Sequence, residues 1–216
     1  MAPGPGRSGS AEAPATGPAR GRFIVLEGGE GCGKSTQAAL LAGALDAVLT
    51  REPGGTVAGE RVRALILDPR SPPLAPRAEA LLVVAARAQH VVEVIEPALA
   101  AGRDVVCDRF SGSTVAYQGY GRGMDVADLV RLSEWATGGL QPDRVVLIEV
   151  SPSTAATRLG ARGAADRMEG SGETFFTRVA AGFAALARAD PMRWRTVQGE
   201  GSIEEVAARV AVAASG

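Results

Sequence analysis

The sequence predicts a three-layer α/β/α fold built on a mostly five-stranded parallel sheet, and three observations support this prediction. Short apolar runs alternate along the chain with segments whose apolar residues recur at helical spacing. The first run leads into a glycine-rich loop and then into such a segment, which is how an α/β unit begins. The runs are apolar at consecutive positions, as in parallel strands that helices cover on both faces. A chain of 216 residues is long enough for one well-buried domain.

The individual elements follow from the apolar pattern in chain order. Phe23 to Leu26 is an apolar run that ends in Glu27-Gly28-Gly29, so we expect a buried strand there. Further strands are predicted at 104–107, 144–150 and near 194–197, about five in all. Helices are predicted at 34–49, 60–67, 76–101, 126–136, 173–189 and from 203 onward, with a loop at 51–55 and an Arg-rich segment at 158–169. In the long helix, the residues expected to face inward are Leu81, Leu82, Ala85, Ala88, Val92 and Ile95.

The first 20 residues differ in composition from the rest of the chain. Ala, Pro, Gly and Ser dominate residues 1–20, which contain no branched aliphatic or aromatic side chain. Such a segment cannot bury enough apolar area to offset the entropy of ordering, so we predict a disordered leader at 1–20 and one domain at 21–216. The leader lacks the apolar centre of a secretory signal, while its Arg and Ser content leaves an organelle transit segment as an alternative.

Composition excludes several function classes. The 23 basic and 24 acidic side chains give a formal net charge of −1, so no overall basic field favours a nucleic-acid polymer as partner. No apolar stretch approaches the roughly 18 residues of a membrane span. The two cysteines, Cys32 and Cys107, are isolated, which fits a reducing compartment, and we expect a cytoplasmic protein. Lys34 is the one lysine among the 23 basic residues, which indicates a position where Arg cannot substitute.

That lysine lies in a phosphate-binding motif. Gly28 to Ser35 matches G-x-x-x-x-G-K-[ST] and stands between a predicted strand and a predicted helix. Glycines let backbone N–H groups converge on phosphate oxygens, Lys34 reaches the β and γ phosphates, and the Ser35 hydroxyl would hold Mg²⁺. The alternative is a glycine-rich turn with a chance lysine. The residues expected to bind the donor nucleotide are Gly28, Gly29, Glu30, Gly31, Cys32, Gly33, Lys34, Ser35 and Thr36.

This motif indicates a P-loop nucleotide-binding protein without fixing its function. A GTPase normally carries an Asn-Lys-x-Asp motif that reads guanine, and the single lysine is already used in the phosphate loop. A transporter-type ATPase would need a Leu-Ser-Gly-Gly-Gln signature, which the sequence lacks. The sequence therefore argues against both classes.

Six further motifs, in order and at matching spacing, resemble the thymidylate kinase family over nearly all of residues 22–198. They are Phe-Ile-Val-Leu-Glu-Gly-Gly-Glu-Gly at 23–31, Thr-Arg-Glu-Pro-Gly-Gly-Thr at 50–56, Arg-Ala-Gln-His-Val at 87–91, Asp-Arg-Phe at 108–110, Ala-Tyr-Gln-Gly at 116–119 and Asp-Arg-Met-Glu at 166–169. The resemblance implies that ATP phosphorylates dTMP directly, with Mg²⁺, to give dTDP and ADP. It also implies a homodimer.

Phosphoryl transfer between two nucleotides gathers negative charge, so arginines are the expected catalytic groups beside Lys34. Arg109 follows the predicted strand that ends at Asp108, and the resemblance implies that it holds the acceptor phosphate. Asp108 is a candidate water-mediated Mg²⁺ partner beside Ser35; the alternative for Asp108 and Arg109 is an ion pair at the end of a strand. A mobile lid at about 155–172 is expected to carry the remaining arginines, Arg158, Arg162 and Arg167.

Arg158 and Arg162 stand four apart and share a helix face, and they are candidate catalytic groups. Relatives that carry an arginine inside the phosphate loop have it where this chain has Gly31, so here the lid must supply it. The alternative is a solvated Arg-rich helix.

The acceptor site is implied by the resemblance. Arg87 would donate to a thymine carbonyl, Thr114 and Gln118 would contact the base edge, and Tyr117 would crowd the 2′ position of the sugar. Tyr117 could equally be a packing residue. The full predicted set comprises Glu27, Arg51, Glu52, Pro53, Val83, Arg87, Arg109, Ser113, Thr114, Tyr117 and Gln118. His90, the one histidine, is expected to be structural.

Two departures from the family pattern fall on this acceptor site. Val83 stands where relatives have an aromatic that stacks on the base, and Gly112 replaces an aspartate. Loss of the aromatic face would weaken base binding by about 1–3 kcal/mol. A kinase for another pyrimidine monophosphate therefore stays open as an alternative, as does a regulatory module that binds ATP without an acceptor.

Overall fold

The computed structural model describes residues 19–162, 167–168, 170 and 172–215, with the backbone alone at Arg162. The predicted leader lies outside these residues except at its last two positions. The predicted lid is described in part, because 163–166, 169 and 171 also lie outside.

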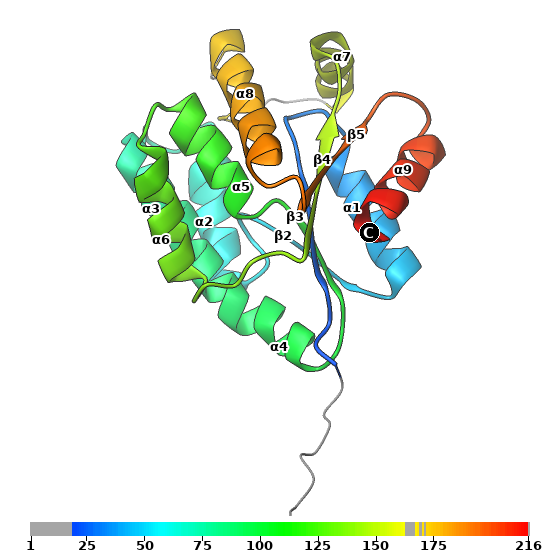
Figure 1. The fold of residues 1–216 in the computed structure, drawn as a ribbon. Coiled ribbons are helices and arrows are strands. Elements are labelled where there is room, and N and C mark those ends of the chain that lie inside the picture. Colours follow the sequence, from blue (N-terminus) through cyan, green and yellow to red (C-terminus); the bar gives the residue numbers. More distant parts are fainter. Residues whose placement is uncertain (1–18, 163–166, 169, 171, 216) are drawn as a thin grey trace, which may run out of the picture.

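A five-stranded parallel sheet forms the centre of the molecule, as predicted (Figure 1). Its strands lie in the order β2-β3-β1-β4-β5, and every neighbouring pair is parallel. Their bounds are β1 Phe23–Glu27, β2 Val48–Arg51, β3 Val105–Asp108, β4 Arg144–Glu149 and β5 Trp194–Gln198. The carboxyl ends of β1, β3 and β4 therefore share one edge, the upper one in Figure 1.

Strand β2 corrects the prediction of one helix over 34–49. Helix α1 spans Lys34–Leu45 and ends where Asp46 adopts a left-handed conformation with φ 50°. Val48 then pairs with Val105 of β3. The apolar residues after Leu45 thus continue the sheet, because the turn at Asp46 redirects the chain.

Two groups of helices cover the sheet. Helices α1 and α9 (Ile203–Ser215) pack on one face, where Leu41, Val206 and Val210 meet β-strand residues such as Ile24. The other face is covered by α4 (Glu96–Ala100), by the π-helix η1 (Val91–Ile95) and by α8 (Glu173–Ala189). The three-layer prediction is confirmed.

The remaining helices surround the upper edge of the sheet and that second face. Their bounds are α2 Val57–Leu67, α3 Pro76–His90, α5 Ser111–Thr114, the π-helix η2 Val115–Gly121, α6 Val126–Ala136 and α7 Pro152–Arg162. The helical segment at 111–121 was not predicted. The predicted helix at 76–101 is present as α3, η1 and α4 in succession. Within the described residues, no helix is long and apolar enough to cross a membrane.

The inward face of the long helix differs from the prediction. Leu81 and Val92 are 56% and 65% exposed, and Ala85 is exposed as well. The buried positions instead include Glu79, Arg87 and His90. Ile95 is fully buried as predicted, and Leu82 and Ala88 are half-buried. The spacing misplaces Leu81, Ala85 and Val92 because it follows apolar residues only, whereas these polar groups find hydrogen-bond partners from other segments in the interior, as described below.

Candidate active site

A cleft of about 810 Å³ opens at the carboxyl edge of the sheet. The predicted site residues that line it are Glu30, Gly31, Gly33, Lys34, Ser35, Thr36, Arg51, Glu52, Pro53, Val83, Arg87, Asp108, Arg109, Ser113, Thr114, Tyr117, Gln118 and Arg158. Of the other predicted residues, Glu27, Gly28, Gly29, Cys32 and Arg167 are not among those that line it. The structure therefore brings most of the predicted donor and acceptor residues to one continuous space.

The phosphate loop joins β1 to α1 through backbone shapes that require glycine. Gly31 and Gly33 have φ of 71° and 91°, and a Cβ at Gly31 would lie 2.7 Å from the carbonyl oxygen of Ala155 in α7. The family's alternative arginine could not fit at Gly31 without moving that helix. Lys34 is buried, and its Nζ donates to the carbonyl oxygen of Gly29 at 2.6 Å.

Ser35 and Asp108 meet across the base of the cleft. The Ser35 hydroxyl donates to Asp108 Oδ2 at 2.5 Å, and both residues line the cleft. Within the described part of the chain, the buried Oδ1 of Asp108 has no hydrogen-bond partner. A buried carboxylate oxygen without a partner beside a hydroxyl is the oxygen donor set that a hydrated Mg²⁺ prefers.

Arg109 lies between the two halves of the cleft in a strained conformation, with φ 74°. Its guanidinium donates to the Gly28 carbonyl at 2.9 Å and to Glu30 Oε1 at 2.7 Å. Burial disfavours the cation, but Tyr117, Glu30, Asp108 and Glu27 outweigh it and hold the pKa of Arg109 well above its usual value. A permanently charged guanidinium is thus fixed beside the phosphate loop.

Tyr117 lines the cleft with its hydroxyl end and packs against the core with its ring. Its hydroxyl accepts from Arg109 at 3.0 Å and donates to Glu30 at 2.8 Å, and it lines the cleft. Its ring makes edge contacts with Phe175 and Phe183 of α8. Burial, followed by the nearby Glu30 carboxylate, raises the pKa of Tyr117 well above its usual value although Arg109 opposes this. The phenol therefore stays a hydrogen-bond donor.

On the acceptor side, Arg87 is the largest fully buried side chain. Its Nε donates to Glu52 Oε2 at 2.7 Å, and its terminal nitrogens donate to Thr114 Oγ1 and to the Phe110 carbonyl at 3.0 Å each. The second oxygen of Glu52 lies 3.0 Å from His90 Nδ1. A guanidinium with these partners has few N–H groups left for a ligand, so its orientation is fixed before a ligand binds.

His90 completes this network as a structural group. An ionised Glu52 only accepts, so Nδ1 carries the proton and Nε2 accepts from the Thr50 hydroxyl at 2.6 Å. A Cβ at Gly55 would lie 2.6 Å from the His90 ring. The histidine therefore ties α3 to the loop at 51–55 that carries acceptor residues.

The family's missing aspartate has a physical explanation in this structure. A Cβ at Gly112 would lie 2.8 Å from the Trp194 ring and 2.9 Å from Glu27 Oε1. Glu27 already accepts from the backbone N–H of Phe110 and from both the N–H and the hydroxyl of Ser113. Burial raises the pKa of Glu27 above its usual 4.5 although Arg109 and these donors oppose it. Trp194 therefore occupies the space of a second carboxylate.

The predicted lid arginines lie in different places. Arg158 donates to the carbonyls of Cys32 at 3.4 Å and Gly199 at 3.0 Å, so it reaches the phosphate loop. The side chain of Arg162 lies outside the described residues. Arg167 donates to the Ile66 carbonyl at 2.7 Å and to Glu79 at 3.1 Å, which places it beside the acceptor half of the cleft.

Sequence reasoning missed several residues of the cleft. Arg63 lines it and donates to the Pro53 carbonyl at 3.0 Å, and burial followed by the nearby Arg51 lowers its pKa. Phe110 packs under the Arg87 guanidinium, 5.2 Å from ring centre to carbon. The Asp-Arg-Phe motif contained the signal for Phe110. Arg63 lies seven residues after the end of a quoted motif, with no spacing that would single it out.

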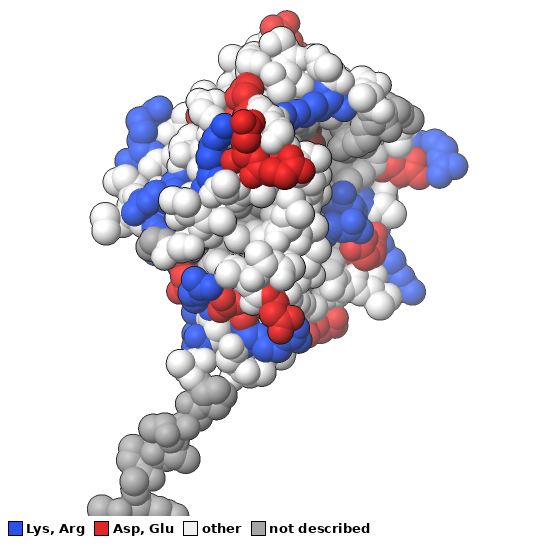
Figure 2. Space-filling view, turned by 90° about the vertical axis from the view of Figure 1, so that its right-hand side faces the viewer, with Lys and Arg blue, Asp and Glu red and all other residues white. Residues whose placement is uncertain are grey.

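The outer surface on the side of α1 and α9 carries mixed charge. Figure 2 shows basic and acidic groups side by side on this face and no continuous basic stripe there. The positive groups of the cleft thus serve a local site, in keeping with the net charge of −1.

The fold and this cleft define a P-loop kinase, with a phosphate loop on one side and a cation-lined acceptor space on the other. The sequence profile of the thymidylate kinase family matches residues 26–210, and the chain belongs to this family. The predicted resemblance and the predicted enzyme class are confirmed.

Solved and curated relatives agree with this assignment. A thymidylate kinase from Synechococcus sp. (strain JA-2-3B'a(2-13)) is 50% identical over 193 residues, 87% of this chain and 91% of the relative. One from Cutibacterium acnes is 46% identical over 191 residues, 86% and 92% of the two chains. The crystal structure of thymidylate kinase from Ehrlichia chaffeensis matches with a TM-score of 0.74 and 34% identity, covering 88% of this chain and 96% of that one.

Proposed function

We propose that this enzyme transfers the γ-phosphoryl group of ATP to dTMP and releases dTDP and ADP. One observation carries the proposal: a single cleft joins the phosphate loop to an acceptor space whose guanidinium, Arg87, is already oriented. A regulatory module has no need for that second space. An oxygen of the acceptor phosphate attacks the γ phosphorus in line, and the bond to the β–γ bridging oxygen breaks.

The protein contributes positioning and charge to this transfer. Lys34 and the loop amides would hold the donor phosphates, and Arg109, bonded to Gly28 and Glu30 beside the phosphate loop, would contact both phosphate chains. Arg158 reaches the same loop from α7 and would neutralise charge that develops during transfer. We also propose that Arg162 contributes positive charge to the transfer and that the predicted lid at about 155–172 closes over ATP.

Mg²⁺ is proposed as the accompanying ion, held by Ser35 directly and by Asp108 through water. The short Ser35–Asp108 contact and the unpartnered Oδ1 support this donor set. When bound, the ion would neutralise the β and γ phosphates.

The test is an ADP-release assay with ATP and a panel of dTMP, dUMP, dCMP, dGMP and ribonucleotide analogues. We expect dTMP to give the highest kcat/KM. Turnover only with nucleotides of another base would contradict dTMP as the acceptor. The absence of turnover with every nucleotide in the panel would favour the regulatory module.

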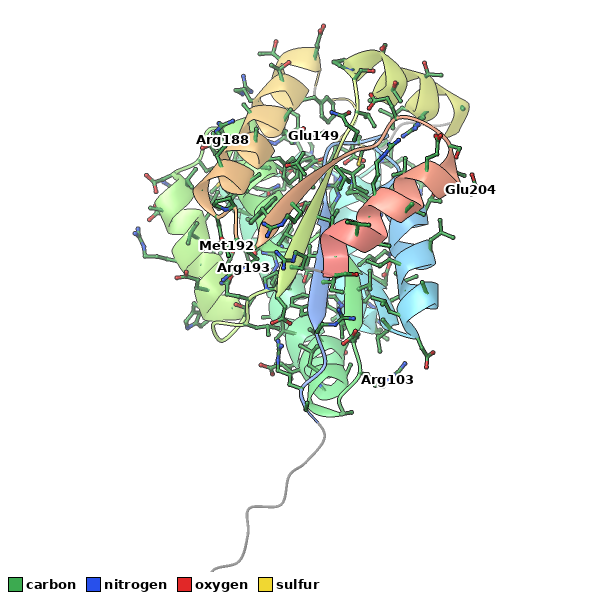
Figure 3. All side chains as sticks on the ribbon, turned by 45° about the vertical axis from the view of Figure 1, so that its right-hand side comes forward. Arg103, Glu149, Arg188, Met192, Arg193 and Glu204 are labelled. Atoms are coloured by element: carbon green, nitrogen blue, oxygen red, sulfur yellow. The ribbon has the colours of Figure 1, made fainter. Side chains whose placement is uncertain are left out.

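A homodimer is proposed because α3 and η1 present an apolar stripe to solvent. Leu81, Ala85 and Val92 lie at helical spacing along it and are exposed, and Trp135 on the neighbouring α6 is 82% exposed. A two-fold contact between copies would bury such a stripe. Leu81→Glu with Val92→Glu should give a monomer by light scattering. Met192→Glu, just before β5 and labelled in Figure 3, is the control and should leave the mass unchanged.

The proposed partners are small nucleotides, with no nucleic-acid polymer, and the proposed location is the cytoplasm. Both cysteines are free and buried, which supports a reducing compartment.

A further inference from the structure

Glu79 is a buried carboxylate that the reaction described above does not use. It lies in the first turn of α3 and is 2% exposed. Gln118 Nε2 donates to its Oε1 at 3.1 Å, Arg122 Nε donates to the same oxygen at 3.3 Å, and Arg167 donates to Oε2 at 3.1 Å. Glu79 thus forms ion pairs with two guanidinium groups, and a carboxylate in an ion pair can only accept hydrogen bonds.

This one-way acceptor fixes the side-chain amide of Gln118. An amide donates from its nitrogen and accepts at its oxygen, so the NH₂ group must face Glu79. The carbonyl oxygen is then turned away from the carboxylate. Gln118 is 4% exposed and lines the cleft together with Val83, Arg87 and Thr114. Its carbonyl oxygen is therefore the atom available to a base in that space.

We propose that Glu79 acts as a positioning residue that holds the Gln118 carbonyl toward the acceptor base, and so selects pyrimidines that carry a hydrogen on ring nitrogen 3. The inference rests on the proposed function, because it needs a base in this half of the cleft. It concerns base choice and leaves the transfer chemistry untouched.

The selection follows from the edge of the base. Thymine and uracil carry N3–H beside a carbonyl at C4, so they donate to Gln118 and accept from Arg87. Cytosine carries a lone pair at N3 and an amino group at C4, and both of these groups oppose the protein. A site built to hydrogen-bond one edge rejects the other strongly, because its buried polar atoms are left unpaired. Thymine and uracil are not separated by this contact.

The arrangement also explains how the site can select a base although Val83 replaces the family's stacking aromatic. An aliphatic contact at position 83 accepts any pyrimidine face, so the edge contact has to provide the discrimination. Glu79 reaches Gln118 from α3, the helix that also carries Val83 and Arg87, so one helix sets both the face and the edge of the acceptor space.

The principal test is Glu79→Gln, with kcat/KM measured for dTMP, dUMP and dCMP. A glutamine at 79 can accept or donate, so the Gln118 amide becomes free to turn. We expect the dTMP-to-dCMP ratio of kcat/KM to fall by about tenfold or more, with dUMP following dTMP. Arg122→Gln is the matched control, because it removes a partner of Glu79 and keeps the Glu79–Gln118 bond. Its ratio should stay within about twofold of wild type. An equal fall in both variants would overturn the proposal.

Gln118→Met keeps the inference testable if Glu79→Gln does not fold. Loss of the carbonyl should lower kcat/KM for dTMP and dUMP by about tenfold while dCMP is unaffected or improved. A similar loss for all three nucleotides would overturn the proposal. Wild-type enzyme that does not turn over dTMP would contradict the proposed function itself, which separates the two failures.

Discussion

The two halves of the cleft are built in opposite ways. The donor half is a contiguous loop that offers backbone amides and one lysine to the phosphates that we propose it binds, with Ser35 next in sequence. The acceptor half is assembled from side chains of β2, α3 and η2, with Arg87, Glu52 and His90 linked in the interior. Within the described residues, Lys34 bonds a backbone carbonyl and no buried carboxylate, so its loss leaves no buried charge without a partner. A buried charged network supports the fold as well as the ligand, so the two halves should respond differently to substitution.

The largest expected effect is on stability, from Arg87→Met. This change leaves Glu52 buried without its guanidinium, and breaking a buried pair costs about 3–5 kcal/mol in the free energy of unfolding. Arg22→Met, in the half-exposed pair with Asp104, is the control and should cost about 1 kcal/mol or less. Urea unfolding measures both. Equal losses would mean that the acceptor network does not support the fold.

Lys34→Met should do the opposite of Arg87→Met, lowering activity strongly while leaving stability almost unchanged. We expect kcat to fall by roughly 10²–10³-fold, since one preorganised cation is lost, while the urea midpoint stays close to wild type. Lys34→Arg should fail as well, because the solitary ammonium lies among close backbone groups. Arg103→Met, at the opposite end of the molecule in Figure 3, is the control. A large loss of stability in Lys34→Met would remove the distinction between the two halves.

Glu27 is buried at the end of β1, where it accepts from Phe110 and Ser113, and its raised pKa predicts that stability depends on pH. A carboxyl with a raised folded-state pKa costs stability as pH rises from 4.5 through that pKa. Glu27→Gln should therefore gain stability relative to wild type over this window, by about 1.4 kcal/mol per unit of pKa difference.

For Glu60 we expect the opposite dependence of stability on pH. Burial raises the pKa of Glu60, but Arg51 and the Gly55 N–H outweigh it and lower the pKa below 4.5. Glu60→Gln should therefore lose stability relative to wild type at neutral pH and approach it in acid. Thermal unfolding from pH 4 to 8 measures both slopes, and parallel curves for Glu27→Gln and wild type would contradict the prediction.

The smallest expected effect is from Val83→Phe. An aromatic ring in the acceptor half should lower KM for dTMP by about fivefold, near 1 kcal/mol, through stacking on the base. KM for ATP should not change, because Val83 lies on α3 with the acceptor residue Arg87. An unchanged KM for dTMP would show that the missing aromatic carries no cost here.

The contrast between the halves also explains what the sequence could predict. The phosphate loop, the order of alternating elements and the pairing of Ser35 with Asp108 follow from contiguous motifs and strand ends. The interior face of α3 could not be predicted, because Glu79, Arg87 and His90 are polar and their partners come from distant segments. Strand β2 was missed because the chain turns at Asp46 without a glycine or proline to mark the turn.

The crowding between Gly112 and Trp194 constrains how this enzyme can change. An aspartate introduced at 112 would collide with the indole, whereas a smaller residue introduced first at 194 would leave a void beside a buried carboxylate. Neither position can be altered alone without a defect, so the two are expected to be exchanged as a pair. Any effort to graft the common carboxylate into this scaffold should therefore begin with a double substitution.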